Sequence, residues 1–273
     1  MQFGLILRSK SAGQAKVSAD QLAALKKLRS KLGGQAYGLT EKNRGLLRKL
    51  DNPQVLSRLI ALPDLLWRNA RRNLSVSKRW FIDLQTSLAI DILLHVLLRI
   101  ENLSALEFDR HLHWPQGRGK PAIMVIPGDE TKNEEPLEFE LPLSLSDRLY
   151  AFRNEIATEV IGRRPDRLFV SIKGVPRGID TLRLAIERTV LRRVGVRITP
   201  HQFRHLGAKI HLNSHPGAYE RVRQLLGHKT LRTTTRFYAG SDTRGAGRAH
   251  AELISKLRAP TLERARRQSD TQQ

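Results

Sequence analysis

An almost uninterrupted apolar run, WFIDLQTSLAIDILLHVLLRIENLSAL at 80–106, constrains the fold more than any other stretch of the chain. A helix that is hydrophobic on all sides must be covered by other elements, so this run predicts a buried helix. The helix would deliver Arg99 near its C-terminal end. A charge at the end of so hydrophobic a helix needs a partner, which marks Arg99 as a candidate functional residue.

Three short segments after this run indicate a small antiparallel sheet. They are rich in β-branched or apolar residues and are separated by Gly, Pro, Asp and Asn, which is typical of strands and turns. We expect strands at 106–114, 121–127 and 136–142, with Lys132 in the turn between the last two. Helical patterns follow, so the predicted fold class is α+β and mainly helical. The expected helices cover about 144–161, 179–194, 200–213, 217–226 and a short stretch from about 230.

Three amphipathic patterns precede the apolar run and predict a small all-helical N-terminal domain. They lie at 18–32, 40–50 and 52–72, and the last is expected to break before Pro63. The polar, basic segment 71–80 is the expected domain boundary. The predicted organisation is a helical domain over 1–74, a second domain over 75–245, and a C-terminal helix and tail over 246–273, with the helix at about 246–258.

The charge balance indicates a polyanionic partner. The chain has 48 Lys and Arg against 26 Asp and Glu, a formal net charge of +22. Such an excess favours binding to phosphates, because each neutralised phosphate releases condensed counterions. Double-stranded DNA is the expected partner, and a merely solvated basic surface is the alternative. The expected DNA contacts in the N-terminal region are Lys26, Lys27, Arg44, Arg48, Arg68, Arg71, Arg72 and Lys78.

Several protein classes are excluded or disfavoured by what the sequence lacks. No apolar stretch reaches the roughly 18 residues of a membrane span, and the N-terminus has no signal-peptide pattern. The absence of cysteine excludes disulfides and thiolate zinc sites. We therefore expect a cytoplasmic protein, associated with the nucleoid when bound to DNA.

The segment TPHQFRHLGAKIHL at 199–212 predicts a helix that directs two side chains at one target. Thr199 can cap the helix, and His201 and Arg204 are three residues apart, hence on the same face. A sharp turn at Gly227 then presents His228, and Tyr238 follows ten residues later.

These residue types match what cleavage of a phosphodiester without metal demands. Two cations must bind the charge that builds on the phosphoryl oxygens, a nucleophile must lose a proton, and the leaving oxygen must gain one. The chain shows no GxxxxGK loop and no carboxylate cluster for Mg²⁺, so no cofactor is expected. The candidates are Arg99 and Arg204 as phosphate ligands, Tyr238 as nucleophile, His201 and His228 as its helpers, and Lys132 as the acid.

Each candidate also has a plain structural interpretation. Tyr238 could fill a core, Arg99 could form a helix-end ion pair with Glu101 or Asp109, and Lys132 could be one exposed turn lysine among others, such as Lys120 and Lys173. A zinc site formed by His201 with other histidines is disfavoured without cysteines or an HExxH arrangement. Those other histidines are His205, His211 and His215, of which His205 is expected to support the site or to pack.

Five elements occur in an order that resembles the tyrosine recombinase (phage integrase) family over about 80–240. They are LLRIENL at 97–103, TK at 131–132, HQFR at 201–204, LGH at 226–228 and FY at 237–238. The resemblance implies a helical core-binding domain, a mixed catalytic domain and DNA strand exchange through a 3′-phosphotyrosine at Tyr238. It also implies a homotetramer on two duplexes in the active complex, with a monomer or weak oligomer when free.

The chain departs from the family pattern at one position of the site. The family usually has an acidic residue three positions after the first arginine, whereas this chain has Asn102. Two other functions stay open: strand relaxation like that of type IB topoisomerases, and DNA binding without cleavage. The segment at 241–260 favours a recombinase, because it is long enough for a helix that packs on a neighbouring subunit.

Overall fold

The computed structural model describes residues 20–24, 38–72, 77–238, 245–247 and 249–258. The chain divides into two compact units, Met1–Tyr37 and Gly38–Gln273. In the first unit residues 20–24 are helical and exposed. The rest of the helix expected at 18–32, with Lys26 and Lys27, lies outside the described residues.

The second unit begins with three helices that agree with the patterns at 40–50 and 52–72. They are α2 (Glu41–Lys49), α3 (Pro53–Ile60) and α4 (Leu62–Arg72), and the side chains of Thr40 and Asn52 cap the first two. Their buried leucines belong to the same hydrophobic core as buried residues of the later helices and of the sheet. The Lys209 ammonium donates to the Leu47 carbonyl at 2.7 Å and also pairs with Asp51. Helices α2, α3 and α4 thus belong to the unit that begins at Gly38, and the domain boundary expected at 71–80 stays a prediction.

Helix α5 (Lys78–His95) is the predicted buried helix, but it ends four residues before Arg99, which was expected at its C-terminal end. Leu97 adopts the left-handed conformation with a φ of 56°, which stops the helix. Arg99 then serves as the N-cap of a separate helix, α6 (Ile100–Ala105). The single helix expected over 80–106 is thus wrong, because a buried contact with Arg204, described below, fixes the Leu97 backbone.

A three-stranded antiparallel sheet follows, in the order β1-β2-β3. Its strands are β1 (Leu112–His113), β2 (Ile123–Ile126) and β3 (Leu137–Glu140), and Met124 pairs with both Leu112 and Phe139. The strand expected over 106–114 is wrong for its first part, where the short helix α7 (Phe108–His111) lies instead. The turn between β2 and β3 begins with a 3-10 helix, η1 (Gly128–Glu130), and carries Lys132 as predicted.

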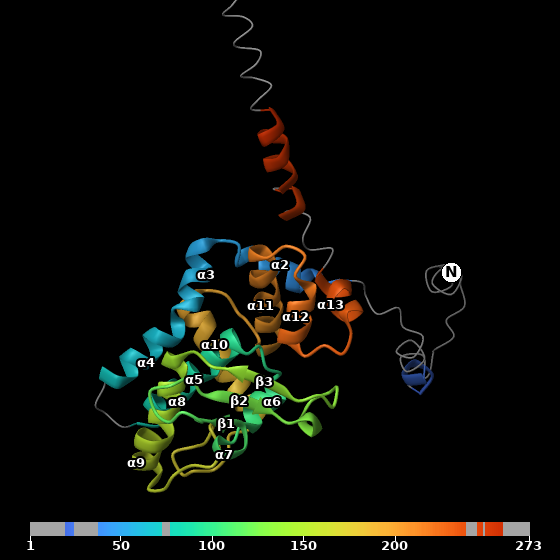
Figure 1. The fold of residues 1–273 in the computed structure, drawn as a ribbon. Helices are drawn as coiled ribbons and strands as arrows, with labels where there is room; N and C mark the ends of the chain where they lie inside the picture. The colour runs from blue at the N-terminus through green and yellow to red at the C-terminus, as the bar shows by residue number, and fades with distance from the viewer. Residues whose placement is uncertain (1–19, 25–37, 73–76, 239–244, 248, 259–273) are drawn as a thin grey trace, which may run out of the picture. The chain divides into compact units, whose positions relative to one another are not determined.

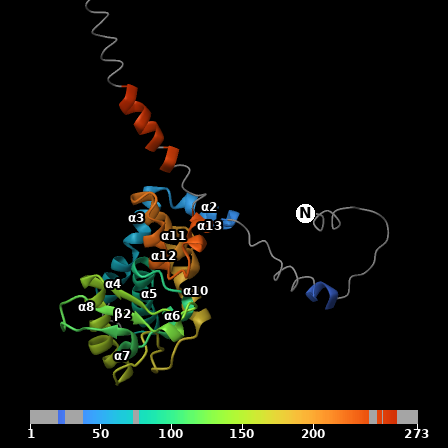
Figure 2. The ribbon, with the colours of Figure 1, turned by 45° about the vertical axis from the view of Figure 1, so that its right-hand side comes forward.

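Helices α4, α8 (Leu143–Ala151), α10 (Ile179–Val194) and α11 (Pro200–Ser214) pack against α5. Figure 1 and Figure 2 both show α2, α11, α12 (Tyr219–Leu226) and α13 (Leu231–Tyr238) together at one end, and the sheet with α7 and α8 at the other. The mainly helical α+β class is confirmed. No helix in the described part of the chain is both long and apolar enough to cross a membrane. The helices are α8 (Leu143–Ala151), the π-helix η2 (Phe152–Ala157), α9 (Thr158–Ile161), α10 (Ile179–Val194), α11 (Pro200–Ser214), α12 (Tyr219–Leu226) and α13 (Leu231–Tyr238), and residues 245–247 and 249–258 are also helical.

Candidate active site

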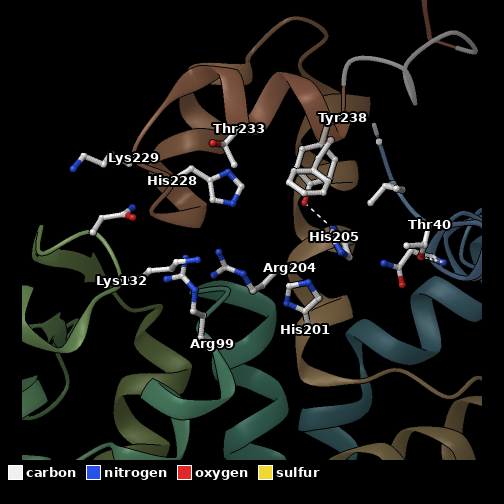
Figure 3. A pocket seen from close by; sticks show the side chains of 15 residues that line it. Thr40, Arg99, Lys132, His201, Arg204, His205, His228, Lys229, Thr233 and Tyr238 are labelled. Carbon is white, nitrogen blue, oxygen red and sulfur yellow. Dashed lines mark hydrogen bonds between the residues drawn. The ribbon is translucent and has the colours of Figure 1, made fainter. Parts of the chain in front are cut away.

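A cavity of about 460 Å³ collects all six residues expected to carry the chemistry. Four parts of the chain supply them: the turn before α6, the β2–β3 turn, helix α11, and the segment that runs from α12 through α13. Figure 3 shows their side chains converging from opposite walls. The six are Arg99, Lys132, His201, Arg204, His228 and Tyr238.

Arg204 is fixed by two backbone carbonyls at the floor of this cavity. Its guanidinium donates from Nη1 to the Leu97 carbonyl and from Nη2 to the Leu226 carbonyl at 2.6 Å. Only 6 % of the residue is exposed. Burial, and secondarily Arg99, lower the pKa of Arg204 to about 10, which leaves it charged at neutral pH. A rigid, poorly hydrated cation of this kind is a strong ligand for a phosphoryl oxygen.

Close packing around Leu97 makes this arrangement possible. A Cβ on Gly207 would lie 2.4 Å from Leu97 Cδ2, so only glycine allows α11 to approach the buried Leu97 side chain. The approach brings the Leu97 carbonyl within reach of Arg204, one helical turn earlier on α11. A strained backbone two residues before Arg99 is the kind of feature that surrounding packing must maintain.

The first turn of α11 is held from both sides. The Thr199 backbone N–H donates to Gln202 Oε1 at 2.9 Å in a capping box, and the Gln202 side chain donates from Nε2 to Asn43 Oδ1 at 3.0 Å. His201 sits on this turn and is the most exposed histidine of the cavity. Partial burial and the cations Arg204 and Arg99 lower the pKa of His201.

His228 is oriented by a buried hydroxyl. Gly227 ends α12 in the left-handed conformation, with a φ of 56°. His228 Nδ1 is hydrogen-bonded to Thr234 Oγ1 at 2.9 Å, and Thr234 is fully buried. Burial, followed by Arg204 and Arg99, lowers the pKa of His228 to about 4. The ring is therefore neutral at pH 7 and turns its other nitrogen toward the cavity (Figure 3).

Two asparagine side chains hold the turn that carries Lys132. Asn133 Nδ2 donates to the Gly227 carbonyl at 2.6 Å, and Asn102 Nδ2 donates to the Glu130 carbonyl at 2.9 Å. Asn102 occupies the slot in which the family usually has an acid, and the amide gives it a donor that a carboxylate lacks. The departure in sequence thus has a defined structural use.

Tyr238 is almost inaccessible, since 2 % of the residue is exposed. Its hydroxyl lies 2.9 Å from His205 Nδ1, and the dashed line in Figure 3 marks this hydrogen bond. Burial raises the pKa of Tyr238 above its usual range, although Arg204 opposes the shift.

Of the plain structural interpretations, the one for Tyr238 agrees with its burial in the core, whereas those for Arg99 and Lys132 find little support. Among the described residues Arg99 has no ion pair, and Asp109 pairs with Arg153 instead. Neither Lys120 nor Lys173 lines the cavity. No cluster of three or more metal-ligating side chains occurs in the described part of the chain.

Sequence reasoning missed several residues that line or support the site. Thr40 and Asn43 reach it from the N-cap and first turn of α2, and Thr234 orients His228 from α13. Their signals in the sequence are an N-cap threonine and a run of threonines, both too common to single out. Further lining residues are Gly38, Leu39, Asn133, His205, Lys229, Thr233 and Phe237.

Those basic residues expected to contact DNA that the structure describes lie on the surface of helices α2, α4 and α5. Arg44 and Arg48 both pair with Glu41 at the surface, at 3.7 and 3.4 Å. The exposed residues of this set are Arg44, Arg48, Arg68, Arg71, Arg72 and Lys78.

The protein belongs to the phage integrase family, whose model matches residues 68–244. The resemblance expected from the motifs is therefore confirmed. The fold is similar to XerH site-specific recombinase in a post-cleavage complex with palindromic difH substrate, with a TM-score of 0.54 and 18% identity over 72% of this chain and 51% of that one. It is also similar to XerA recombinase, with a TM-score of 0.50 and 17% identity over 84% of this chain and 74% of that one. No curated protein matches the chain. The chain thus spans about half the length of XerH.

Proposed function

We propose that the protein is a site-specific DNA recombinase that cuts and rejoins strands through a covalent 3′-phosphotyrosine at Tyr238, without metal or ATP. One observation carries the proposal: a single cavity brings together two arginines, three histidines with lowered pKa values, a turn lysine and a tyrosine. Family membership supports it. XerH, which shares the fold, is described in complex with its difH substrate after cleavage.

The reaction assigns one task to each group. The Tyr238 oxygen attacks phosphorus, the bond from phosphorus to the 5′ oxygen breaks, and the 5′ oxygen takes a proton from Lys132. The phosphotyrosine ester keeps the energy of the phosphodiester, so attack by a 5′ hydroxyl can rejoin a strand. Rejoining to a different strand gives recombination.

The arginines and histidines stabilise the charge of the transition state and handle the proton of the nucleophile. Arg99 and Arg204 bind the two non-bridging oxygens, where charge grows in the transition state. His201 and His228 are neutral at pH 7 because their pKa values are lowered. A neutral imidazole can accept the tyrosine proton or donate a hydrogen bond to a phosphoryl oxygen. We assign proton acceptance to His201 and hydrogen-bond donation to His228, whose Nδ1 is occupied by Thr234.

Double-stranded DNA is the proposed partner. The net charge of +22 favours it, and the exposed cations of α2, α4 and α5 give a surface for phosphates. We assign DNA binding to residues 1–74 together with the face around the cavity. The active complex would be a homotetramer on two duplexes, with the C-terminal segment 246–273 exchanged between subunits. In that segment Leu253 and Leu257 are exposed on one face of the helix, which suits packing on a partner.

A selection for covalent adducts tests the proposal without knowledge of the target site. A pool of nicked duplexes with randomised core sequence lets the cut strand escape, so the adduct accumulates. Adducts that survive boiling in detergent would be recovered and sequenced. The native chain should enrich a defined sequence, and Tyr238→Phe should give none. The matched control Tyr219→Phe, on α12, should behave as the native chain.

Further assays of the same protein distinguish a recombinase from a type IB topoisomerase and from a protein that only binds DNA. A type IB topoisomerase would relax supercoiled plasmid as a monomer and would not exchange strands between two labelled duplexes. A protein that only binds DNA would yield no adduct from any pool, and this outcome would refute the proposal.

A further inference from the structure

The contact between His205 and Tyr238 has no task in the reaction proposed above. His205 lies on α11 directly after Arg204, and 7 % of the residue is exposed. Its Nδ1 meets the Tyr238 hydroxyl at 2.9 Å, and the two rings lie edge to face with centroids 5.9 Å apart. His205 also packs edge to face on His201, with centroids 4.9 Å apart. The residue therefore links a phosphate-side histidine to the nucleophile.

The direction of this hydrogen bond depends on the charge and the tautomer of His205. Burial, followed by His201, Arg204 and His228, lowers the pKa of His205 to about 4. A neutral imidazole nitrogen is a better acceptor than a phenol oxygen, and a phenol is the better donor. With the imidazole proton on Nε2, Tyr238 donates a hydrogen bond to His205 Nδ1. The bond keeps the proton on or near the hydroxyl, because neutral His205 has little tendency to take it.

The same bond directs the oxygen of Tyr238 away from a substrate. A phosphate must approach the oxygen in line with the bond that breaks, and an oxygen on a residue that is 2 % exposed offers no such path. The Tyr238 side chain has to leave His205 before it can attack. Figure 3 shows the hydroxyl aimed at His205 while the arginines and Lys132 meet on the other side of the cavity.

We propose that His205 is a positioning residue that holds the Tyr238 hydroxyl in a resting place, so that cleavage begins with the exchange of this hydrogen bond for the DNA phosphate. The proposal rests on the function assigned to Tyr238. In this role His205 restrains premature cleavage.

Two substitutions separate restraint from catalysis and from packing. His205→Asn keeps an acceptor near the position of Nδ1 but cannot take a proton, and His205→Leu removes the acceptor while filling similar space. Single-turnover cleavage would be followed on the nicked duplexes enriched by the native chain. We expect His205→Leu to cleave about 2- to 12-fold faster, the factor that corresponds to one net hydrogen bond. His205→Asn should keep the native rate.

The contrary outcomes are distinct. If both variants cleave much more slowly, His205 is a base or a direct participant, and the resting role is wrong. If both cleave at the native rate, the bond restrains nothing, and the proposal is equally wrong. DNA affinity and a thermal melt of each variant identify loss of folding, and a misfolded leucine variant leaves the spectroscopic test below to decide.

Nitrogen-15 spectra of histidine-labelled protein test the bond without any DNA. The His205 resonances would be assigned by their loss in His205→Asn. We expect Tyr238→Phe to shift the Nδ1 resonance of His205 at pH 7 and Tyr219→Phe to leave it in place. An unchanged Nδ1 resonance in Tyr238→Phe would overturn the proposal. This readout does not depend on cleavage, so failure of the His205 proposal and failure of the recombinase proposal can be told apart.

Discussion

Asn133 donates from its side-chain amide to the carbonyl oxygen of Gly227 at 2.6 Å, and this bond joins the turn that carries Lys132 to the corner that presents His228. Two groups proposed to act on the same phosphate, Lys132 on the leaving 5′ oxygen and His228 on a phosphoryl oxygen, are thereby held together. Without this bond the ammonium group of Lys132, at the end of a flexible side chain, would be positioned less precisely against the leaving oxygen.

Removal of this bond should impair protonation of the leaving group. Asn133→Ala is expected to slow single-turnover cleavage about 10-fold, and Lys132→Ala to slow it more. Both defects should largely disappear with a substrate whose leaving 5′ oxygen is replaced by sulfur, since a thiolate leaves without a proton. Asn213→Ala, an exposed asparagine on α11, serves as the control. Equal defects on oxygen and sulfur substrates would show that Asn133 does not act through Lys132.

Replacement of Asn102 by the acid that the family usually has at this position should destabilise the protein. Asn102→Asp replaces a donor to the Glu130 carbonyl with a second acceptor, and it adds charge beside a Glu130 that already pairs with Arg110 and His111. We expect a loss of about 1 to 3 kcal/mol in the free energy of unfolding, measured by urea denaturation. A stabilised Asn102→Asp variant would mean that the bond to Glu130 is not needed.

Two glycine-to-alanine substitutions should have opposite effects on stability. In Gly207→Ala the new methyl group meets the buried Leu97 side chain at 2.4 Å, and overpacking of this kind costs about 1 to 3 kcal/mol. Gly45→Ala, in α2, places its methyl group in open space and should stabilise the helix by up to about 1 kcal/mol. Leu97→Ala should reduce the penalty of Gly207→Ala in a double-mutant cycle. Additive effects would refute the clash.

Acid should destabilise the protein through the buried histidines of the cavity. The pKa of His205 is about 4 in the folded chain and about 6.5 in the unfolded chain. The unfolded state therefore binds more protons between these values, so the stabilisation is complete above pH 6.5 and is lost as pH falls toward 4. For His205 the loss between pH 7 and pH 5 is about 2 kcal/mol. His205→Asn should remove that share of the loss in urea titrations, and an identical drop in both proteins would contradict the assignment.

Sequence alone predicts those parts of the site that are encoded locally. The spacing in HQFR places His201 and Arg204 on one helical face, and Gly227 places His228 at a corner. Most helices and two of the three strands follow from periodicity and turn residues for the same reason. The identities of the six cavity residues can therefore be predicted from local motifs and their order along the chain.

The features that the sequence does not predict depend on contacts between distant segments. The end of α5 at His95 follows from the meeting of Leu97 with Arg204 and Gly207, which no local pattern encodes. The same is true of Asn133 with Gly227 and of His205 with Tyr238. The helix α7 replaces an expected strand because apolar alternation over so short a segment fits both structures.

The most direct test of the account is to identify the amino acid that becomes linked to DNA. The adduct from the selected duplex would be digested with nuclease and trypsin, and the peptide that carries a nucleotide would be sequenced by mass spectrometry. The account predicts the modification on Tyr238, within the peptide FYAGSDTR at 237–244. A nucleotide on any other residue, such as Tyr150 or Tyr219, would contradict it.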